Sequence, residues 1–163
     1  MLAESKALAL RWLAARPRTE RQVREKLAQQ GCDTDIVDAV VTWLLGLRYL
    51  DDAAYAHLRA RNLIAPGRLG PVLARRRLEA TGITQELARA AVEAALADSE
   101  DPNAGPTDRI TRERALAQAA LDRRTNGVAP PDDKSRARLA RFLLARGFSG
   151  EVVSAVLGVF ADG

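Results

Sequence analysis

The chain of 163 residues has very little of the side-chain chemistry on which most catalytic and metal sites depend. Its only cysteine is Cys32, which excludes an internal disulfide and a multi-cysteine metal site. Its only histidine is His57, which leaves almost no material for a histidine-based triad or a zinc cluster. It has no apolar run of about eighteen residues, so the sequence predicts no transmembrane helix. Charged residues such as Glu4, Lys6 and Arg11 interrupt the N-terminal region. We therefore expect no secretory signal and a cytoplasmic protein.

Aromatic residues are also scarce, at 4% of the chain, whereas alanine contributes 31 residues and leucine 22. Strong helix formers therefore dominate, and the β-branched and aromatic residues that favour strands are few. The hydrophobic fraction of 47% is large enough to form a core. The composition predicts an all-α fold.

A short pattern occurs three times around a glycine. The three segments span residues 24–44, 75–96 and 139–160, and their glycines are Gly31, Gly82 and Gly147. A leucine stands four residues before each glycine, and an apolar residue follows it. The next position holds a helix-capping residue, which is Asp33, Thr84 or Ser149, and an acid comes two residues later. Glycine in the left-handed conformation closes one helix and the capping side chain begins the next, so each segment predicts two helices joined by a glycine turn.

Each of these segments follows a further helical stretch, at residues 5–16, 52–64 and 111–124. The sequence therefore predicts three tandem three-helix units in an elongated, curved array, because a unit of this size packs against its neighbours. We assign the units to residues 1–50, 51–98 and 109–163, with a polar linker at 99–108 that contains two prolines. Thr19 and Gln22 predict a capping box at the start of a helix.

The few residues that resemble catalytic or metal-binding groups have simpler structural interpretations. Asp51 and Asp52 stand at the start of a helix, where one caps it and the other interacts favourably with its dipole. Cys32 occupies a position that is apolar in the other two repeats, so we expect it in the core. His57 has no companion ligand in the sequence. We expect no catalytic residue, no metal and no cofactor.

The arginines are unevenly distributed along the chain. No acid lies between Asp52 and Glu79, but six arginines do: Arg59, Arg61, Arg68, Arg75, Arg76 and Arg77. A second acid-free run, between Asp133 and Glu151, includes Arg138, Arg141 and Arg146. These nine residues are the candidate contacts for phosphates or for an acidic protein surface. An Arg-rich composition that only solvates helix faces is the alternative.

Several motifs resemble one bacterial family. The run Leu47–Asp52 (LRYLDD), followed by Tyr55 and Ala56, resembles a signature of the RecX regulators of recombination. Further similar segments follow in the same order: 14–19 (AARPRT), 23–27 (VREKL), 67–71 (GRLGP), Leu78 with 82–83, and 139–148. The resemblance covers residues 6–158.

The resemblance implies both the fold and the partner. RecX-like proteins have three tandem three-helix units and are not enzymes. They bind the RecA recombinase and its filament on single-stranded DNA, and restrain its ATPase and strand exchange during DNA repair and the SOS response. We accordingly expect a monomer whose nine arginines meet the filament, and leave open whether they touch DNA directly. The family's contact residues are not defined by a motif, so charge alone assigns them here.

A second hypothesis is an autonomous DNA-binding protein that uses its glycine turns as helix-turn-helix elements and acts without RecA. The net charge is only +4, and no single helix combines exposed Asn, Gln and Arg as a recognition helix would. The sequence thus favours the RecX-like interpretation.

Overall fold

A computed structural model describes residues 1–98 and 108–158, and within these ranges all regular structure is helical. The first unit contains α1 (Leu2–Ala15), α2 (Glu20–Gln29) and α3 (Thr34–Gly46). The second contains α4 (Asp52–Ile64), a 3₁₀ turn, η1 (Ala65–Gly67), α5 (Pro71–Ala80) and α6 (Gln85–Ala97). The third contains α7 (Arg109–Thr125), α8 (Asp133–Ala145) and α9 (Gly150–Leu157). The all-α prediction is confirmed. The linker predicted at 99–108 lies outside the described residues except for Asp108, and Phe160 of the third repeat lies outside them too.

The three repeat turns have the same hydrogen-bonding pattern. Gly31, Gly82 and Gly147 are left-handed, with φ of 78°, 98° and 85°. In each turn, the apolar residue after the glycine donates its N–H to a leucine carbonyl. That leucine stands four residues before the glycine. The N···O distances are 3.2 Å for Cys32–Leu27, 3.4 Å for Ile83–Leu78 and 3.2 Å for Phe148–Leu143. This is a Schellman motif, in which those two side chains also meet, so it explains why both positions are apolar.

The capping side chains predicted at the helix starts form their hydrogen bonds, with one exception. Thr19 and Gln22 form the predicted capping box. The Thr84 and Ser149 hydroxyls accept hydrogen bonds from Leu87 N–H and Val152 N–H. Asp33 stands at the N-cap of α3, but its carboxylate makes no capping hydrogen bond. The prediction that Asp33 stands at the N-cap is therefore confirmed, but the prediction that its side chain accepts a capping hydrogen bond is wrong.

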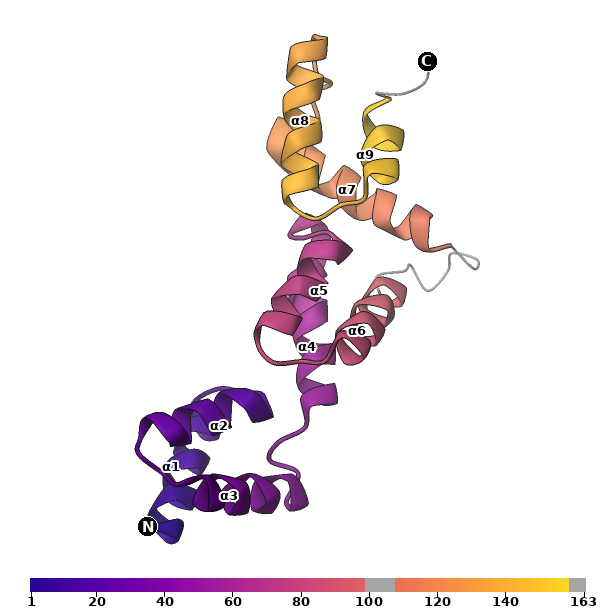
Figure 1. Cartoon of the computed structure of the whole chain (residues 1–163). Coiled ribbons are helices and arrows are strands. Elements are labelled where there is room, and N and C mark those ends of the chain that lie inside the picture. Colours follow the sequence, from indigo (N-terminus) through magenta and orange to yellow (C-terminus); the bar gives the residue numbers. More distant parts are fainter. Residues whose placement is uncertain (99–107, 159–163) are drawn as a thin grey trace.

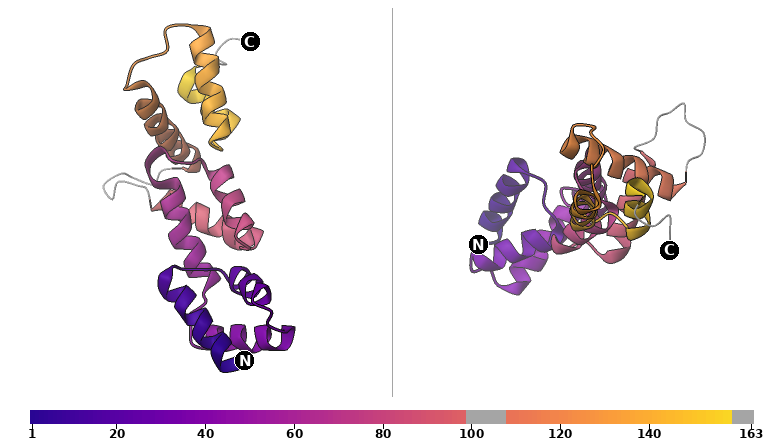
Figure 2. Two further views of the ribbon diagram at one scale, coloured as in Figure 1. Left: turned by 90° about the vertical axis from the view of Figure 1, so that its left-hand side faces the viewer. Right: turned by 90° about the horizontal axis from the view of Figure 1, so that it is seen from above.

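The buried apolar side chains of the described residues form two separate cores of different size. The first unit has its own core, which includes Val23, Leu27 and Leu44. The second and third units share a single core, in which Leu78 and Leu143 belong to one continuous cluster. Figures 1 and 2 show an elongated molecule with the three units following one another along its length. Apolar burial therefore joins the second unit to the third, whereas the first unit needs other contacts.

One acid that the sequence did not single out is buried in the third unit. Glu113 of α7 is only 2% exposed, and its carboxylate accepts a hydrogen bond of 2.7 Å from Ser149 N–H at the start of α9. The amide groups of a helix start have no partner within their own helix, and the positive end of its dipole favours a carboxylate. Glu113 thus holds the first turn of α9 against α7.

Candidate functional site

The second helices of the three units, which are α2, α5 and α8, lie end to end. At the end of α8, the carbonyls of Arg146 and Gly147 accept hydrogen bonds from Gly70 N–H at 2.8 Å and Val72 N–H at 3.1 Å, which begin α5. The last carbonyls of one helix and the first amides of another have no partners within their own helices, so they satisfy each other here. Pro71, at the first position of α5, has no N–H to satisfy.

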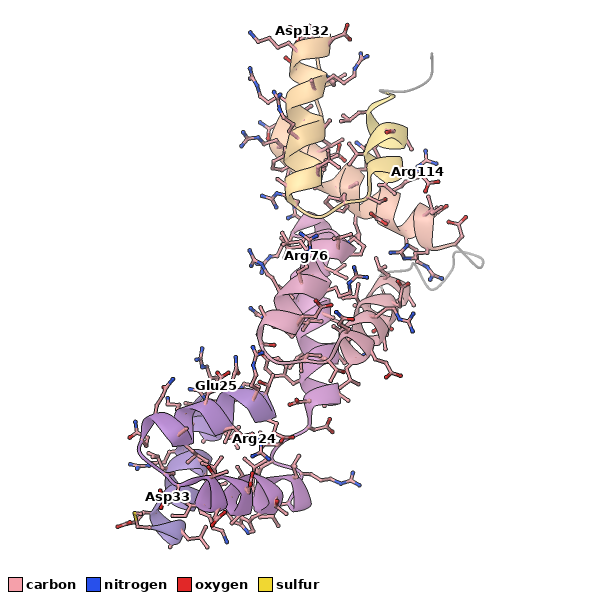
Figure 3. The ribbon with its side chains drawn as sticks, viewed as in Figure 1. Arg24, Glu25, Asp33, Arg76, Arg114 and Asp132 are labelled. Carbon is pink, nitrogen blue, oxygen red and sulfur yellow. The ribbon has the colours of Figure 1, made fainter. Side chains whose placement is uncertain are left out.

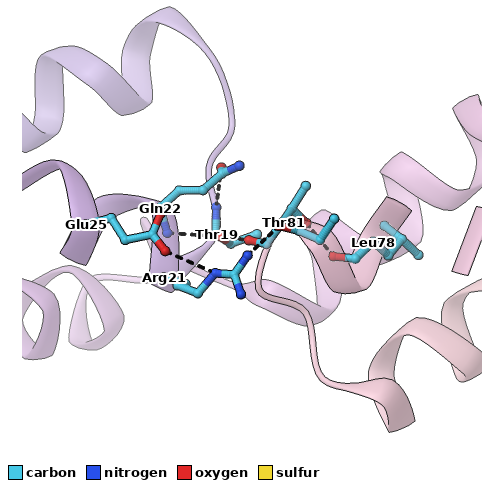
Figure 4. A network of polar contacts seen from close by, with 7 residues as sticks. Thr19, Arg21, Gln22, Glu25, Leu78 and Thr81 are labelled. Atoms are coloured by element: carbon cyan, nitrogen blue, oxygen red, sulfur yellow. Dashed lines mark hydrogen bonds and ion pairs between the residues drawn. The ribbon is translucent and has the colours of Figure 1, made fainter. Parts of the chain in front are cut away.

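The other end of α5 meets the start of α2, but here side chains and not backbone amides donate to the last carbonyls of α5 (Figure 4). The Thr19 hydroxyl is fully buried and donates to the Thr81 carbonyl at 2.6 Å. The guanidinium of Arg21 donates to the Ala80 carbonyl. Figure 1 shows the result, with α8, α5 and α2 following one another along the molecule. We call these three helices the central row.

Asp52 contributes a third contact between the first two units. We predicted that its carboxylate would interact favourably with its own helix. It lies in the first turn of α4, as predicted, and it also accepts a hydrogen bond of 2.9 Å from Glu20 N–H, the first residue of α2. Asp51 forms the predicted cap, at 2.8 Å from Ala54 N–H. Burial raises the pKa of the Asp52 carboxyl above its usual value. Both acids therefore serve helix starts, and Asp52 joins two units.

The raised pKa of Asp52 predicts a pH-dependent difference between the wild type and Asp52→Asn. A carboxyl whose pKa is higher in the folded than in the unfolded protein binds more protons when folded, so its contribution to stability falls as pH rises above about 4. Asparagine retains an acceptor for Glu20 N–H without the charge. The wild type should therefore lose stability relative to Asp52→Asn as the pH rises from about 4 through the titration of this carboxyl. Urea unfolding at several pH values measures this, and a gain with rising pH would contradict it.

The central row carries most of the predicted site. Arg75, Arg76 and Arg77 lie on α5, and Arg138 and Arg141 lie on α8. Arg75 is 3.7 Å from Glu79, whereas the other four are exposed and make no hydrogen bond or ion pair within residues 1–98 and 108–158. Figure 3 shows Arg76 on α5 and further side-chain nitrogens projecting along α8. Arg76, Arg77, Arg138 and Arg141, which we call the row arginines, are therefore the predicted site residues that the row leaves exposed. Lys134 of α8 is exposed as well, and the charge of Arg138 interacts with the carboxylate of Asp132 at the start of α8.

Arg146 has a structural task at the junction of the second and third units. Its guanidinium donates to the Arg68 carbonyl at 2.7 Å and lies 4.7 Å from the centre of the Phe142 ring. It is therefore engaged within the fold and is less available to a partner than the exposed row arginines.

The remaining predicted arginines lie on α4 and on the turn that follows it. Arg61 of α4 is 3.7 Å from Asp98. Arg59 and Arg68 line a shallow pocket together with Arg123 of α7. Sequence reasoning missed Arg123, although the pair Arg123–Arg124 at the end of a predicted helix was a visible signal. Of the nine predicted residues, five thus lie on the central row and two line the pocket. The other two, Arg61 and Arg146, make contacts within the fold.

Family models recognise two of the three units. The model for the first three-helix domain of RecX matches residues 6–44, and the model for its third three-helix domain matches residues 112–157. A curated relative, Regulatory protein RecX of Acidithiobacillus ferrooxidans, is 36% identical over 152 residues, covering 93% of this chain and 87% of its own. This chain belongs to the RecX family. The family resemblance drawn from its motifs is confirmed.

Other RecX proteins agree in sequence and in fold. Regulatory protein RecX of Lactobacillus delbrueckii is 36% identical over 155 residues, and the chain spans 94% of its own length but only 52% of that relative. The crystal structure of RecX from Lactobacillus salivarius superposes with a TM-score of 0.70 at 21% identity, over 97% of this chain and 95% of that one. The three-unit RecX architecture therefore extends over nearly the whole chain.

Other residues considered in the sequence have ordinary surroundings in this RecX-family chain. Cys32, which we expected in the core, is only partly buried and packs against the first core, with its sulfur 3.3 Å from the Ser5 hydroxyl. His57 is half exposed, with Nε2 3.8 Å from Asp98. Within the described ranges, no group of three or more His, Cys, Asp and Glu side chains is placed to hold a metal ion. No helix among those residues has the length and apolar character needed to cross a membrane.

Proposed function

We propose that this chain regulates homologous recombination in the cytoplasm by binding the RecA recombinase and its filament on single-stranded DNA. It inhibits the filament's ATPase and strand exchange, and acts as a monomer without catalysis of its own. Membership of a family whose relatives are named regulatory proteins supports the regulatory role. The observation that carries the proposal is the central row, which presents four exposed arginines from two units.

The shape of the molecule suits a repetitive, negatively charged partner. The helices of the central row are joined by hydrogen bonds between backbone groups and polar side chains, so its arginines lie on one continuous support. A recombinase filament on DNA offers both phosphates and acidic protein surface at regular intervals. An elongated molecule lying along its groove would block filament growth or the subunit movements that accompany ATP turnover. The affinity should fall with salt in proportion to the charges engaged.

DNA-dependent ATP hydrolysis by RecA, measured with increasing amounts of this protein, tests the proposal. We expect ATP hydrolysis to fall at low salt, and the inhibition to weaken as salt rises because exposed ionic contacts are screened. Undiminished hydrolysis at low salt, with filaments shown to be well formed, would contradict the central claim.

A binding measurement with DNA alone separates this proposal from an autonomous DNA-binding protein. We expect weak binding without sequence preference, since phosphate contacts carry no sequence information. Tight, sequence-selective binding in the absence of RecA would favour the autonomous alternative.

A further inference from the structure

The shallow pocket between the second and third units collects positive charge from three elements. It is lined by Arg59 and Asn62 of α4, by Ala65, Pro66 and Arg68 of the turn that follows, and by Arg123 of α7. The three arginines give the pocket a formal charge of +3, and no acid among residues 1–98 and 108–158 lines it. The neighbouring pocket on α5 and α6 has three arginines but also Glu79 and Glu86, so its formal charge is only +1. An anion is therefore attracted far more strongly to the first pocket.

The three guanidinium groups are not used elsewhere in the fold. Among the residues that the structure describes, the side chains of Arg59, Arg68 and Arg123 make no hydrogen bond or ion pair. Like charges that share one pocket repel one another, and the repulsion persists until an anion or solvent compensates it. All three side chains are exposed, so water and salt screen most of this repulsion until an anion binds.

The pocket is held in shape before any ligand arrives. Gly67 has a left-handed φ of 69°, and a Cβ at that position would lie 2.7 Å from the backbone nitrogen of Ala120, so the turn packs directly on α7. Arg146 holds the same turn through hydrogen bonds to the carbonyls of Gly67 at 3.4 Å and Arg68 at 2.7 Å. Because the turn and α7 are fixed against each other, the backbone positions of Arg68 and Arg123 are set before a ligand binds, and only their exposed side chains have to be ordered.

We propose that this pocket is a binding site for a phosphate group. Three guanidinium groups and the Asn62 amide together offer more N–H donors than the two oxygens of a carboxylate can accept, whereas a phosphate has more oxygens and up to twice the charge. Arg59 and Arg68 belong to the second unit and Arg123 to the third. A bound phosphate therefore links the two units. Phosphate binding at this site requires no recombinase, so it can be tested independently of the proposed function.

Calorimetric titration of the full chain with three probes at low salt tests this inference. The probes are inorganic pyrophosphate, a thymidine oligonucleotide and a glutamate-rich peptide of similar charge. The matched variants are Arg123→Gln in the pocket and Arg114→Gln, which removes the same charge from an exposed position elsewhere on α7. We expect Arg123→Gln to weaken phosphate binding about tenfold or more, since a charge-assisted hydrogen bond is lost, and Arg114→Gln to change it by less than about twofold.

The outcomes separate the possible sources of the phosphate. Binding of pyrophosphate that depends on Arg123 supports a free or terminal phosphate as ligand, and Arg123-dependent binding of the oligonucleotide alone supports a backbone phosphodiester. The arginine Nε–H signals of the wild-type protein in NMR spectra give a second measurement, in which Arg59, Arg68 and Arg123 should shift together. Equal losses in both variants, binding of the peptide alone, or no saturable binding would overturn the proposal.

Discussion

Replacing the four row arginines, Arg76, Arg77, Arg138 and Arg141, with glutamine is expected to weaken binding to a RecA filament by about a hundredfold. Four exposed ionic contacts of ~0.7 kcal/mol each amount to roughly 2.8 kcal/mol, which corresponds to two decades in affinity. The fold should be retained, because these side chains are exposed and make no hydrogen bond or ion pair in the described part of the chain. The concentration needed for half-inhibition of RecA's ATPase measures the loss.

The salt dependence distinguishes specific contacts from the general loss of charge. The control is a second fourfold variant that changes exposed arginines away from the row: Arg11, Arg16, Arg48 and Arg114. Both variants remove four positive charges from the chain. We expect the affinity of the row variant to depend much less steeply on salt than that of the wild type, and the control variant to retain most of the wild-type slope. Equal weakening in both would mean that net charge, and not the row, determines binding.

Replacing Gly70 with alanine is expected to lower the free energy of unfolding by about 3 kcal/mol. A Cβ at this position would lie 2.4 Å from the carbonyl carbon and oxygen of Gly147 and 2.4 Å from the nitrogen of Phe148. All three are backbone atoms, so no side chain can rotate away to make room. The added methyl group must push α5 away from α8, and this breaks the end-to-end hydrogen bonds and loosens the core that the second and third units share.

Gly46→Ala is the matched control for that experiment. Gly46 lies in α3, and a Cβ there would meet nothing within 4 Å. The same substitution should therefore stabilise the protein by about 0.5–1 kcal/mol, because alanine favours a helix over the unfolded chain. Urea unfolding followed by circular dichroism compares the two variants with the wild type. A Gly70→Ala protein as stable as the wild type would show that the two helices do not depend on this close approach.

The two junctions of the central row use similar geometry but different stabilising forces. Between the second and third units, the backbone hydrogen bonds are backed by a common apolar core. Between the first and second units, the contacts of Thr19, Arg21 and Asp52 are polar, and the cores remain separate. Polar contacts contribute less net stability than extensive apolar burial. The first unit is consequently held by the weaker of the two junctions.

The sequence alone predicted the parts of this protein that depend on neighbouring residues. Helix propensity, glycine turns and capping side chains act over about four residues, so the helices, the three repeats and the cap at Asp51 were correctly predicted. The same local patterns placed most of the arginines on helices, but they did not show which of the side chains make contacts within the fold. It also assigned Asp52 to its own helix, because the amide that it meets belongs to a residue 32 positions earlier.

Only the tertiary structure decided how the helices join and which charges remain available. The end of α8 meets the start of α5 through residues more than seventy positions apart, and no periodicity in the sequence encodes such a contact. That junction engages Arg146 within the fold, and the packing of η1 on α7 brings Arg123 to Arg59 and Arg68. Local patterns determine secondary structure because they act along the chain. The proposed arginine surface depends on contacts between distant segments, so its location is defined only in the folded chain.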